Sequence, residues 1–281
     1  NNPSSHILNG KSLMIGGSTS INTFDSYYSG DLSAIIIRNL PIWVQLKRSP
    51  SIGTALLEDW EKKIEKIVRE SANQNITSIS GVPSWTIIII NEIMKKMDAK
   101  YLTDIWPNLE LYMHGGISFK TYKKSFNKYI DSKKINYLEL YNASEGFFAI
   151  QNEGNKSDLL LLLNHGVFYE FIPIENGEEM EDKIIPLERV KKYHTYAMVI
   201  TTNGGLWRYK IGDTVSFTSL YPFKIKIIGR TKSFINAFGE ELSVDNANQA
   251  IESACKKTNA SVNEYTAGPF FYKNKTGCHE W

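Results

Sequence analysis

The sequence predicts an α/β protein that carries an antiparallel β subdomain and the start of a small α+β unit. Up to Gly166, short apolar runs alternate with segments of helical periodicity, as in sheets covered by helices. After Gly166, strand-like runs follow one another with no long helix between them. We therefore expect a large domain over residues 1–229, and a hinge with a partial C-terminal domain over residues 230–281.

Four segments show helical patterns. Thr54–Ser71 and Phe119–Ile130 place apolar residues near helical spacing, with charges between them. Trp85–Met97 contains an isoleucine run that favours a strand, but it follows Pro83 and ends in lysines, so we predict a helix. Val244–Lys257 is predicted as a helix of the last unit.

The remaining apolar runs are predicted as strands, and Asn203-Gly204-Gly205 is a hairpin turn signal between two of them. In chain order the predicted strands are Ser33–Arg38, Leu109–Met113, Tyr137–Tyr141, Leu159–Leu163, Val167–Ile172, Tyr196–Thr202, Leu206–Phe217, Phe223–Ile228 and Glu264–Tyr272.

Composition excludes several classes of protein. Hydrophobic residues make up 42% of the 281 residues and charged residues 22%, which excludes a disordered or fibrous chain. The net charge of +2 provides no electrostatic basis for binding nucleic acid or an anionic membrane, and no obligatory protein partner is indicated. The longest aliphatic run, Ile87–Ile90, is too short to span a bilayer. Only two cysteines are present and no signal peptide is seen, so we expect a cytoplasmic protein.

Three polar or glycine-rich stretches follow predicted strands, where open α/β sheets bind ligands. The first contains Gly115 and Gly116, whose lack of side chains lets a flat ligand approach the backbone, although an ordinary turn is the simpler reading. The second contains Tyr141, Ser144 and Glu145. A hydroxyl beside a carboxylate suits a phosphate oxygen and Mg²⁺, whereas the alternative is a helix N-cap formed by Ser144.

The third stretch ends in Gly212-Asp213. A carboxylate in such a position can accept hydrogen bonds from both hydroxyls of a ribose, whereas the alternative is an aspartate in a turn. Gly229-Arg230-Thr231-Lys232 follows as a basic turn between two units, with a solvated linker as its alternative.

In this order the motifs resemble those of the adenylate-forming enzymes. More closely, the chain resembles the auxin-responsive acyl acid–amido synthetase family, and its bacterial branch in particular. The resemblance covers nearly the whole chain and rests on five segments: GVPSW, WPNLELYMHGG, YNASEGFFAIQ, LWRYKIGDTV and GRTKSFINAFGEEL.

The resemblance implies an enzyme that binds ATP and Mg²⁺, converts a carboxylic acid to an acyl-adenylate, and joins it to the amine of an amino acid. It also implies roles for individual residues. Gly115 and Gly116 would lie against the adenine, with Tyr141 flanking the ring. Ser144, in contact with the α-phosphate, and Glu145, holding Mg²⁺, would be the catalytic residues. Asp213, supported by Arg230, would bind the ribose, Lys232 would be the hinge, and the acyl pocket would be lined by Val82, Trp85, Phe147 and Phe148.

Two departures from the family pattern concern activity. The stretch Gly16–Ser20 lacks the lysine continuation of the family's phosphate loop, so we expect that loop to be absent from the chain. Plant members also place a catalytic lysine beyond the hinge, whereas Asn236–Glu241 contains acids and no lysine. The polar opening Asn1–Ser5 and the early end at Trp281 suggest a chain cut from a longer protein at both ends.

Three readings of the function follow. The first is an ATP-dependent acid–amino acid ligase. The second keeps adenylation but transfers the acyl group to a thiol such as coenzyme A, since the sequence does not choose between the two acceptors. The third is a non-catalytic nucleotide-binding module, which the missing phosphate loop favours for this chain.

Overall fold

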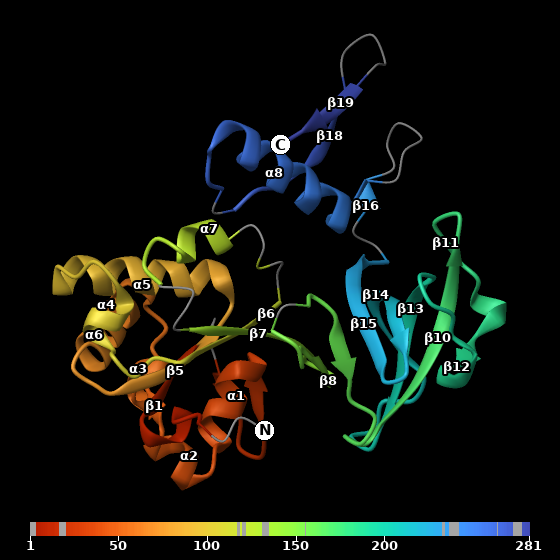
Figure 1. Ribbon diagram of the computed structural model, residues 1–281. Helices are drawn as coiled ribbons and strands as arrows, with labels where there is room; N and C mark the ends of the chain where they lie inside the picture. The colour runs from red at the N-terminus through yellow and green to blue at the C-terminus, as the bar shows by residue number, and fades with distance from the viewer. Residues whose placement is uncertain are drawn as a thin grey trace. The chain divides into compact units, whose positions relative to one another are not determined.

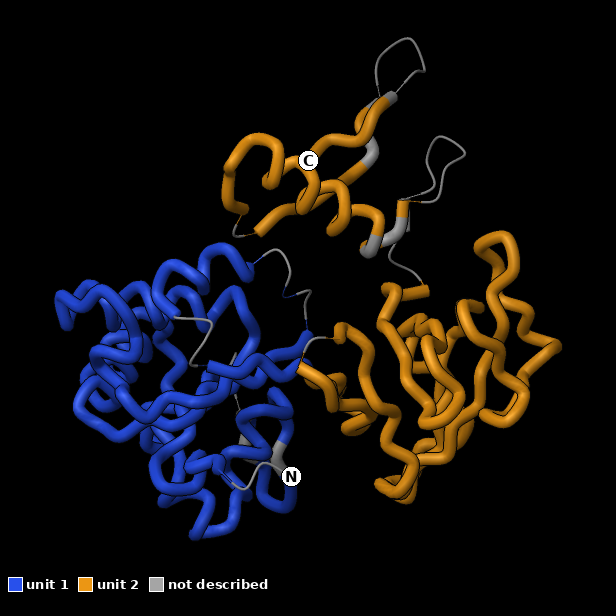
Figure 2. Tube along the Cα trace, viewed as in Figure 1, with its two compact units in different colours: residues 1–139 blue, residues 140–281 orange. Residues whose placement is uncertain are grey.

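The computed structural model describes residues 4–16, 21–116, 119, 122–130, 135–154, 156–231, 234–235, 242–262, 264–271 and 277–281. The chain divides into two compact units, residues 1–139 and residues 140–281 (Figure 2). The boundary expected near residue 230 for a C-terminal domain stays a prediction.

The first unit contains a parallel sheet in the order β4-β1-β5-β6. Leu13, Ile76 and Ile79 on these strands are fully buried and pack in one core with apolar residues of α4 and α5. The elements of this unit are η1 (Ile7–Asn9), β1 (Lys11–Ile15), β2 (Ile21–Thr23), β3 (Tyr28–Gly30), α1 (Leu32–Asn39), α2 (Ile42–Leu46), β4 (Arg48–Ser49), α3 (Ile52–Ala55), α4 (Trp60–Ser71), β5 (Ile76–Gly81), α5 (Pro83–Met97), α6 (Leu102–Ile105), β6 (Leu111–Gly115) and α7 (Lys123–Phe126) (Figure 1).

The second unit contains antiparallel strands in the order β8-β9-β15-β14-β13-β10, and β7 pairs antiparallel with β8. The antiparallel subdomain predicted after Gly166 is therefore confirmed. The elements are β7 (Asn136–Ala143), which crosses the boundary in sequence, β8 (Gly146–Ile150), β9 (Leu159–Leu161), β10 (Val167–Glu175), β11 (Glu178–Glu179), η3 (Glu181–Lys183), β12 (Ile185–Pro186), η4 (Leu187–Arg189), β13 (Thr195–Thr202), β14 (Tyr209–Leu220), β15 (Phe223–Arg230), β16 (Phe234–Ile235), β17 (Leu242–Ser243), α8 (Val244–Thr258), β18 (Gly268–Phe271) and β19 (Gly277–Glu280) (Figure 1).

Two of the predicted helices are confirmed and one predicted strand is wrong. Helix α5 begins at Pro83, where proline is favoured because its missing N–H is not needed, and α8 begins at the predicted Val244. The segment 33–38, predicted as a strand, belongs to α1. The side chain of Asp31 caps this helix by accepting a hydrogen bond of 2.8 Å from the Ser33 N–H, and this cap outweighs the strand preference of three isoleucines.

Two other predicted helices differ from the structure. The segment 54–71 is split, because α3 ends at Ala55 and a new cap, Asp59, starts α4 by accepting from the Lys62 N–H at 3.1 Å. Of the segment 119–130, only Lys123–Phe126 is α-helical among the described residues. Strands β1 and β5 were not predicted, because serine and threonine interrupt their apolar pattern.

The loop between β8 and β9 is held by Gln151 and Glu153. The Gln151 amide donates 2.6 Å to the Lys156 carbonyl, while the Glu153 carboxylate pairs with Lys156 at 2.6 Å and with the buried ammonium of Lys224. Hydrogen bonds from the two lysines lower the pKa of Glu153 to about 2.

We expect Glu153→Gln to lower Tm near neutral pH. A depressed carboxyl pKa contributes stability that is present above about pH 4.5 and lost as the pH falls towards 2, so the Tm difference from the original chain should shrink over that range. Thermal melts between pH 2 and 7 measure it. Glu188→Gln, at an exposed position in η4, is the control and should show no such trend. A Tm difference for Glu153→Gln that is independent of pH would contradict the account.

Candidate nucleotide site

Three of the predicted binding residues of the second unit lie together. The Tyr141 hydroxyl, from β7, donates a hydrogen bond of 2.7 Å to Asp213 Oδ2 on β14. Arg230, the last residue of β15, places Nε 3.2 Å from Asp213 Oδ1. The Asp213 side chain is 15% exposed and that of Arg230 is 62% exposed, so a nearly buried carboxylate is reached by a cation from the solvent side.

The electrostatics of this group leave Asp213 able to bind a further donor. Burial first, and then the charge of Asp213, raises the pKa of Tyr141 far above its ordinary value, so its hydroxyl stays protonated and donates. A carboxylate has about four acceptor positions, and Tyr141 and Arg230 use one on each oxygen. Counting only the partners in the described part of the chain, two acceptor positions remain, which is the number that two ribose hydroxyls require.

The register of β14 and β15 brings Asp213 and Arg230 together. The two residues are direct partners in the ladder, next to a register shift between Thr214 and Val215. Gly212 has φ of +85°, which residues other than glycine rarely adopt. Its carbonyl accepts a hydrogen bond of 2.8 Å from the Thr231 N–H. Asp213 lies within β14, as it does in the predicted strand 206–217, so the alternative of an aspartate in a turn is wrong. Gly229 and Arg230 lie in β15, so they are not a linker either.

Ser144 and Glu145 form the two-residue connection between β7 and β8, because Ala143 and Gly146 are paired in the ladder. The alternative of a helix N-cap at Ser144 is therefore wrong. Ser144 is exposed and Glu145 is half-buried. The carboxylate of Glu145 is close enough to the Tyr141–Asp213 pair to contribute to the raised pKa of Tyr141.

The residues around Glu145 can be compared with the oxygen ligands that Mg²⁺ requires. Among the residues that the structure describes, no group of three or more histidine, cysteine, aspartate or glutamate side chains is placed to hold a metal ion. Mg²⁺ in nucleotide sites is commonly held by one or two carboxylates together with phosphate oxygens. Glu145 fits that arrangement as the single protein carboxylate.

The first unit places Gly115, Gly116, Val82 and Trp85 near the carboxyl ends of β5 and β6. Gly115 ends β6, and Gly116 has φ of +82°, a conformation that favours glycine. Val82 is the N-cap residue of α5, and its Cγ2 lies 3.7 Å from the place a Cβ would take on Gly116. Trp85 is half-buried in the first turn of α5, with its ring centroid 6.2 Å from that of Trp60.

The two phenylalanines predicted for the acyl pocket lie on β8 and differ in exposure. Phe148 is fully buried and packs edge-on against Tyr141, with the ring centroids 5.1 Å apart, so it supports the ring beside Asp213. Phe147 is half-buried and stacks on His165 at 6.4 Å. Their role in an acyl pocket stays a prediction.

Several predicted positions lie outside the described residues: the hinge Lys232, most of the stretch 16–20, and the segment 236–241. The direct pairing of Arg230 with Asp213 was not predicted from the sequence. The hairpin turn at Tyr221-Pro222 indicates that the two strands pair, but two register shifts lie between this turn and Asp213, so counting outward from the turn does not establish its partner.

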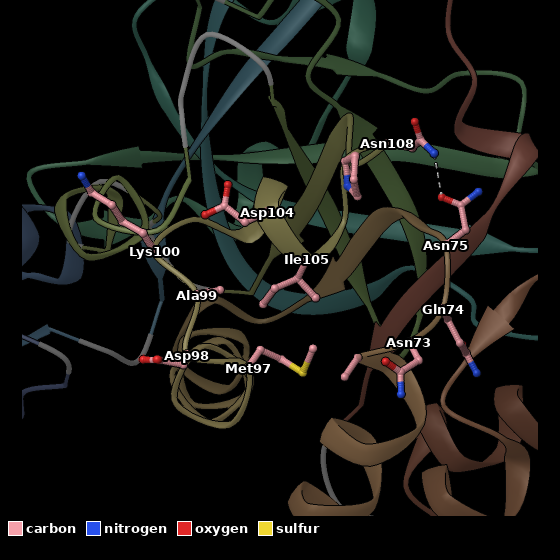
Figure 3. A pocket seen from close by; sticks show the side chains of 12 residues that line it. Asn73, Gln74, Asn75, Met97, Asp98, Ala99, Lys100, Asp104, Ile105 and Asn108 are labelled. Atoms are coloured by element: carbon pink, nitrogen blue, oxygen red, sulfur yellow. Dashed lines mark hydrogen bonds between the residues drawn. The ribbon is translucent and has the colours of Figure 1, made fainter.

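A groove of about 710 Å³ lies elsewhere in the first unit (Figure 3). It is lined by residues before β5 and β6 and around the end of α5, including Asn75, Met97 and Asn108, and the Asn108 amide donates 3.1 Å to Asn75 Oδ1. None of the predicted site residues lines this groove. Across the described part of the chain, the helices are too short or too polar to cross a membrane.

Two family models match the chain. The GH3 family N-terminal domain matches residues 4–135, and the GH3 family central domain matches residues 160–230. In sequence, the chain is 29% identical over 116 residues to indole-3-acetic acid-amido synthetase GH3.10 of Arabidopsis thaliana, covering 36% of this chain and 20% of that protein. It is 25% identical over 229 residues to GH3.3 of the same plant, also named an indole-3-acetic acid-amido synthetase, covering 75% of this chain and 36% of that protein.

Solved structures show the same fold. GH3.15 acyl acid amido synthetase superposes with a TM-score of 0.74 at 14% identity, covering 93% of this chain and 56% of that one. A 2-hydroxyisobutyryl-CoA ligase in complex with an acyl-AMP superposes with a TM-score of 0.55 at 11% identity, covering 87% and 48%. These matches confirm the adenylate-forming fold. The chain spans about half or less of the length of the proteins it matches.

Proposed function

Because this chain belongs to the GH3 family, we propose that it is part of an ATP-dependent ligase that activates a carboxylic acid as an acyl-adenylate and joins it to an amino acid. The observation that carries the proposal is the Tyr141–Asp213–Arg230 arrangement, which leaves two acceptor positions on a nearly buried carboxylate. The names of the relatives, which are amido synthetases, support the same reaction.

In the proposed reaction, a carboxylate oxygen of the acid attacks the α-phosphorus of ATP and pyrophosphate leaves. The amine nitrogen of the amino acid then attacks the acyl carbonyl, AMP leaves, and the nitrogen loses a proton. Such reactions depend mainly on positioning and electrostatics, so no cysteine or serine nucleophile is needed.

Most of the predicted residues bind the nucleotide, and Ser144 and Glu145 are the proposed catalytic residues because they would contact the reacting phosphate and its metal ion. Asp213 accepts hydrogen bonds from the ribose hydroxyls, while Tyr141 and Arg230 fix the orientation of its carboxylate. Gly115 and Gly116 leave room for the adenine. Ser144 contacts the α-phosphate from the β7–β8 turn.

Glu145 would hold Mg²⁺, which when bound neutralises phosphate charge. The same proposal includes Lys232 as the hinge and a cytoplasmic location. It also includes an acyl pocket lined by Val82, Trp85, Phe147 and Phe148. We also propose that the chain belongs to the bacterial branch of the family.

The experiment that tests the function is acid-dependent ATP–pyrophosphate exchange by the protein as its gene encodes it, with a broad panel of carboxylic acids. Exchange above background for some acid is expected, followed by amide formation when amino acids are added. If the acyl group is transferred to coenzyme A and not to an amine, the protein is an acyl–CoA-forming ligase and not an acid–amino acid ligase. AMP binding without exchange for any acid would leave only a nucleotide-binding module and would contradict the ligase.

A further inference from the structure

Strand β14 bulges where it carries the proposed ribose-binding carboxylate. Lys210 pairs with Val199 of β13 and Thr214 pairs with Ala197, so residues 211–213 of β14 all lie opposite a single residue of β13. Such bulges interrupt the regular ladder and redirect side chains, and they are frequent beside binding sites. The bulge therefore changes which groups of this segment face the other neighbouring strand, β15.

Arg230 of β15 contacts this bulge at two points. Its Nε lies 3.2 Å from Asp213 Oδ1, and its Nη2 donates a hydrogen bond of 3.3 Å to the Ile211 carbonyl. The backbone beside it is fixed as well, because the Thr231 N–H donates 2.8 Å to the Gly212 carbonyl. The Arg230 side chain is mostly exposed, so without these contacts it would be free to change rotamer and would hold the carboxylate weakly.

Glycine at position 212 permits this geometry. Its φ of +85° is a left-handed value, which L-residues adopt only at a cost. The space around it is ordinary, since a Cβ on Gly212 would lie 3.7 Å from Arg230 Nη2 and 3.9 Å from Thr231 Oγ1. The requirement for glycine is therefore conformational and not steric, and it falls between the two groups that bind the guanidinium.

We propose that Gly212 is a positioning residue for the ribose site. Its left-handed conformation turns the Ile211 carbonyl and the Asp213 carboxylate toward one guanidinium, that of Arg230, which then fixes the orientation of the carboxylate. The hold on Arg230 is a property of the chain alone, whereas its effect on ribose recognition rests on the proposed function.

The first test observes Arg230 without any ligand, through the signal of its side-chain Nε–H in proton–nitrogen NMR spectra. Loss of the signal in Arg230→Lys assigns it. A guanidinium held by two acceptors exchanges this proton slowly with water, so the original chain should show the signal. Gly212→Ala should broaden or remove it, because alanine disfavours the left-handed backbone. A signal that is absent from the original chain, or unchanged in Gly212→Ala, would overturn the proposal.

Gly205→Ala is the matched control for the cost of a left-handed alanine. Gly205 lies in the connection between β13 and β14, with φ of +100° and no atom within 4 Å of an added Cβ. Its variant should lose stability for the same conformational reason and keep the Arg230 signal.

Gly212→Asn should give an Arg230 signal of intermediate strength, because asparagine tolerates the left-handed region better than alanine. It replaces the alanine variant if that variant does not fold, and Gly205→Asn is then its control. Arg230 signals of equal strength in these two asparagine variants would overturn the proposal.

The second test measures the affinities of the same variants for AMP and 2′-deoxy-AMP by calorimetry. Gly212→Ala should weaken AMP binding about tenfold and bring the ratio of the two affinities close to one. Gly205→Ala should keep the ratio of the original chain, because both nucleotides bind the same folded molecules and lost stability alone does not alter it. A ratio that is unchanged in Gly212→Ala contradicts the positioning role.

Failure of the original chain to bind AMP would count against the proposed nucleotide site and would end the ribose part of the inference with it. The NMR comparison of Gly212→Ala with Gly205→Ala would still decide whether Gly212 holds Arg230 against the bulge.

Discussion

Replacing Asp213 by alanine should weaken binding of AMP to this chain about a hundredfold. The change removes the acceptor of two proposed ribose hydrogen bonds, and a hydrogen bond to a charged group contributes about 1.5 kcal/mol or more. Two such bonds amount to about 3 kcal/mol, which corresponds to two orders of magnitude in Kd. Isothermal titration calorimetry with AMP measures the effect directly.

Two further variants separate the binding role of Asp213 from its structural role. Asp213→Asn keeps an acceptor for the Tyr141 hydroxyl and should fold normally, while its affinity falls because the charge is lost. Tyr141→Phe keeps the carboxylate and its pairing with Arg230, so the loss of affinity should be at most about tenfold. An alanine variant that is folded and binds AMP within threefold of the original would remove Asp213 from the site.

Replacing Gly10 by alanine should be among the most destabilising single changes in the first unit. A Cβ on Gly10 would lie 2.4 Å from the backbone oxygen of Asn75 and 2.5 Å from Thr77 Cγ2. That same Asn75 oxygen accepts the Lys11 N–H at 2.8 Å, at the start of β1, so the backbone cannot yield without loss of sheet contacts. Overpacking of this kind costs about 3 kcal/mol, which should lower Tm by roughly 6–12 °C.

Gly53→Ala is the matched control for that prediction. Gly53 lies in α3 with no atom within 4 Å of the added Cβ. Alanine is favoured over glycine in a helix by about 0.5–1 kcal/mol, so Tm should stay unchanged or rise slightly. Equal losses of Tm in the two variants would show that the clash at Gly10 is not the cause.

The sequence predicted elements well where a local signal and the apolar pattern agree. Helix α5 has a proline at its first position and lysines in its last turn, and its prediction was correct. In α1 the two signals disagree, since three consecutive isoleucines indicate a strand while Asp31 provides a cap. The cap decided the outcome, and only the backbone conformation around Asp31 shows that it is used.

The candidate site was predicted as residue types and not as contacts. The sequence indicated that Tyr141, Asp213 and Arg230 could serve one nucleotide. It could not show that the Tyr141 hydroxyl, rather than its ring alone, reaches Asp213, because these residues are 72 positions apart. The pairing of Asp213 with Arg230 depends on the register of β14 and β15, which includes register shifts that no local pattern reveals.

The claim on which the account depends is that the Asp213 carboxylate recognises the hydroxyls of a ribose. Comparing the affinity of the chain for AMP and for 2′-deoxy-AMP, in the original chain and in Asp213→Asn, measures this most directly. The account predicts that removing one hydroxyl costs the original chain about tenfold in Kd and costs the variant much less. Equal affinities of the original chain for the two nucleotides would contradict it.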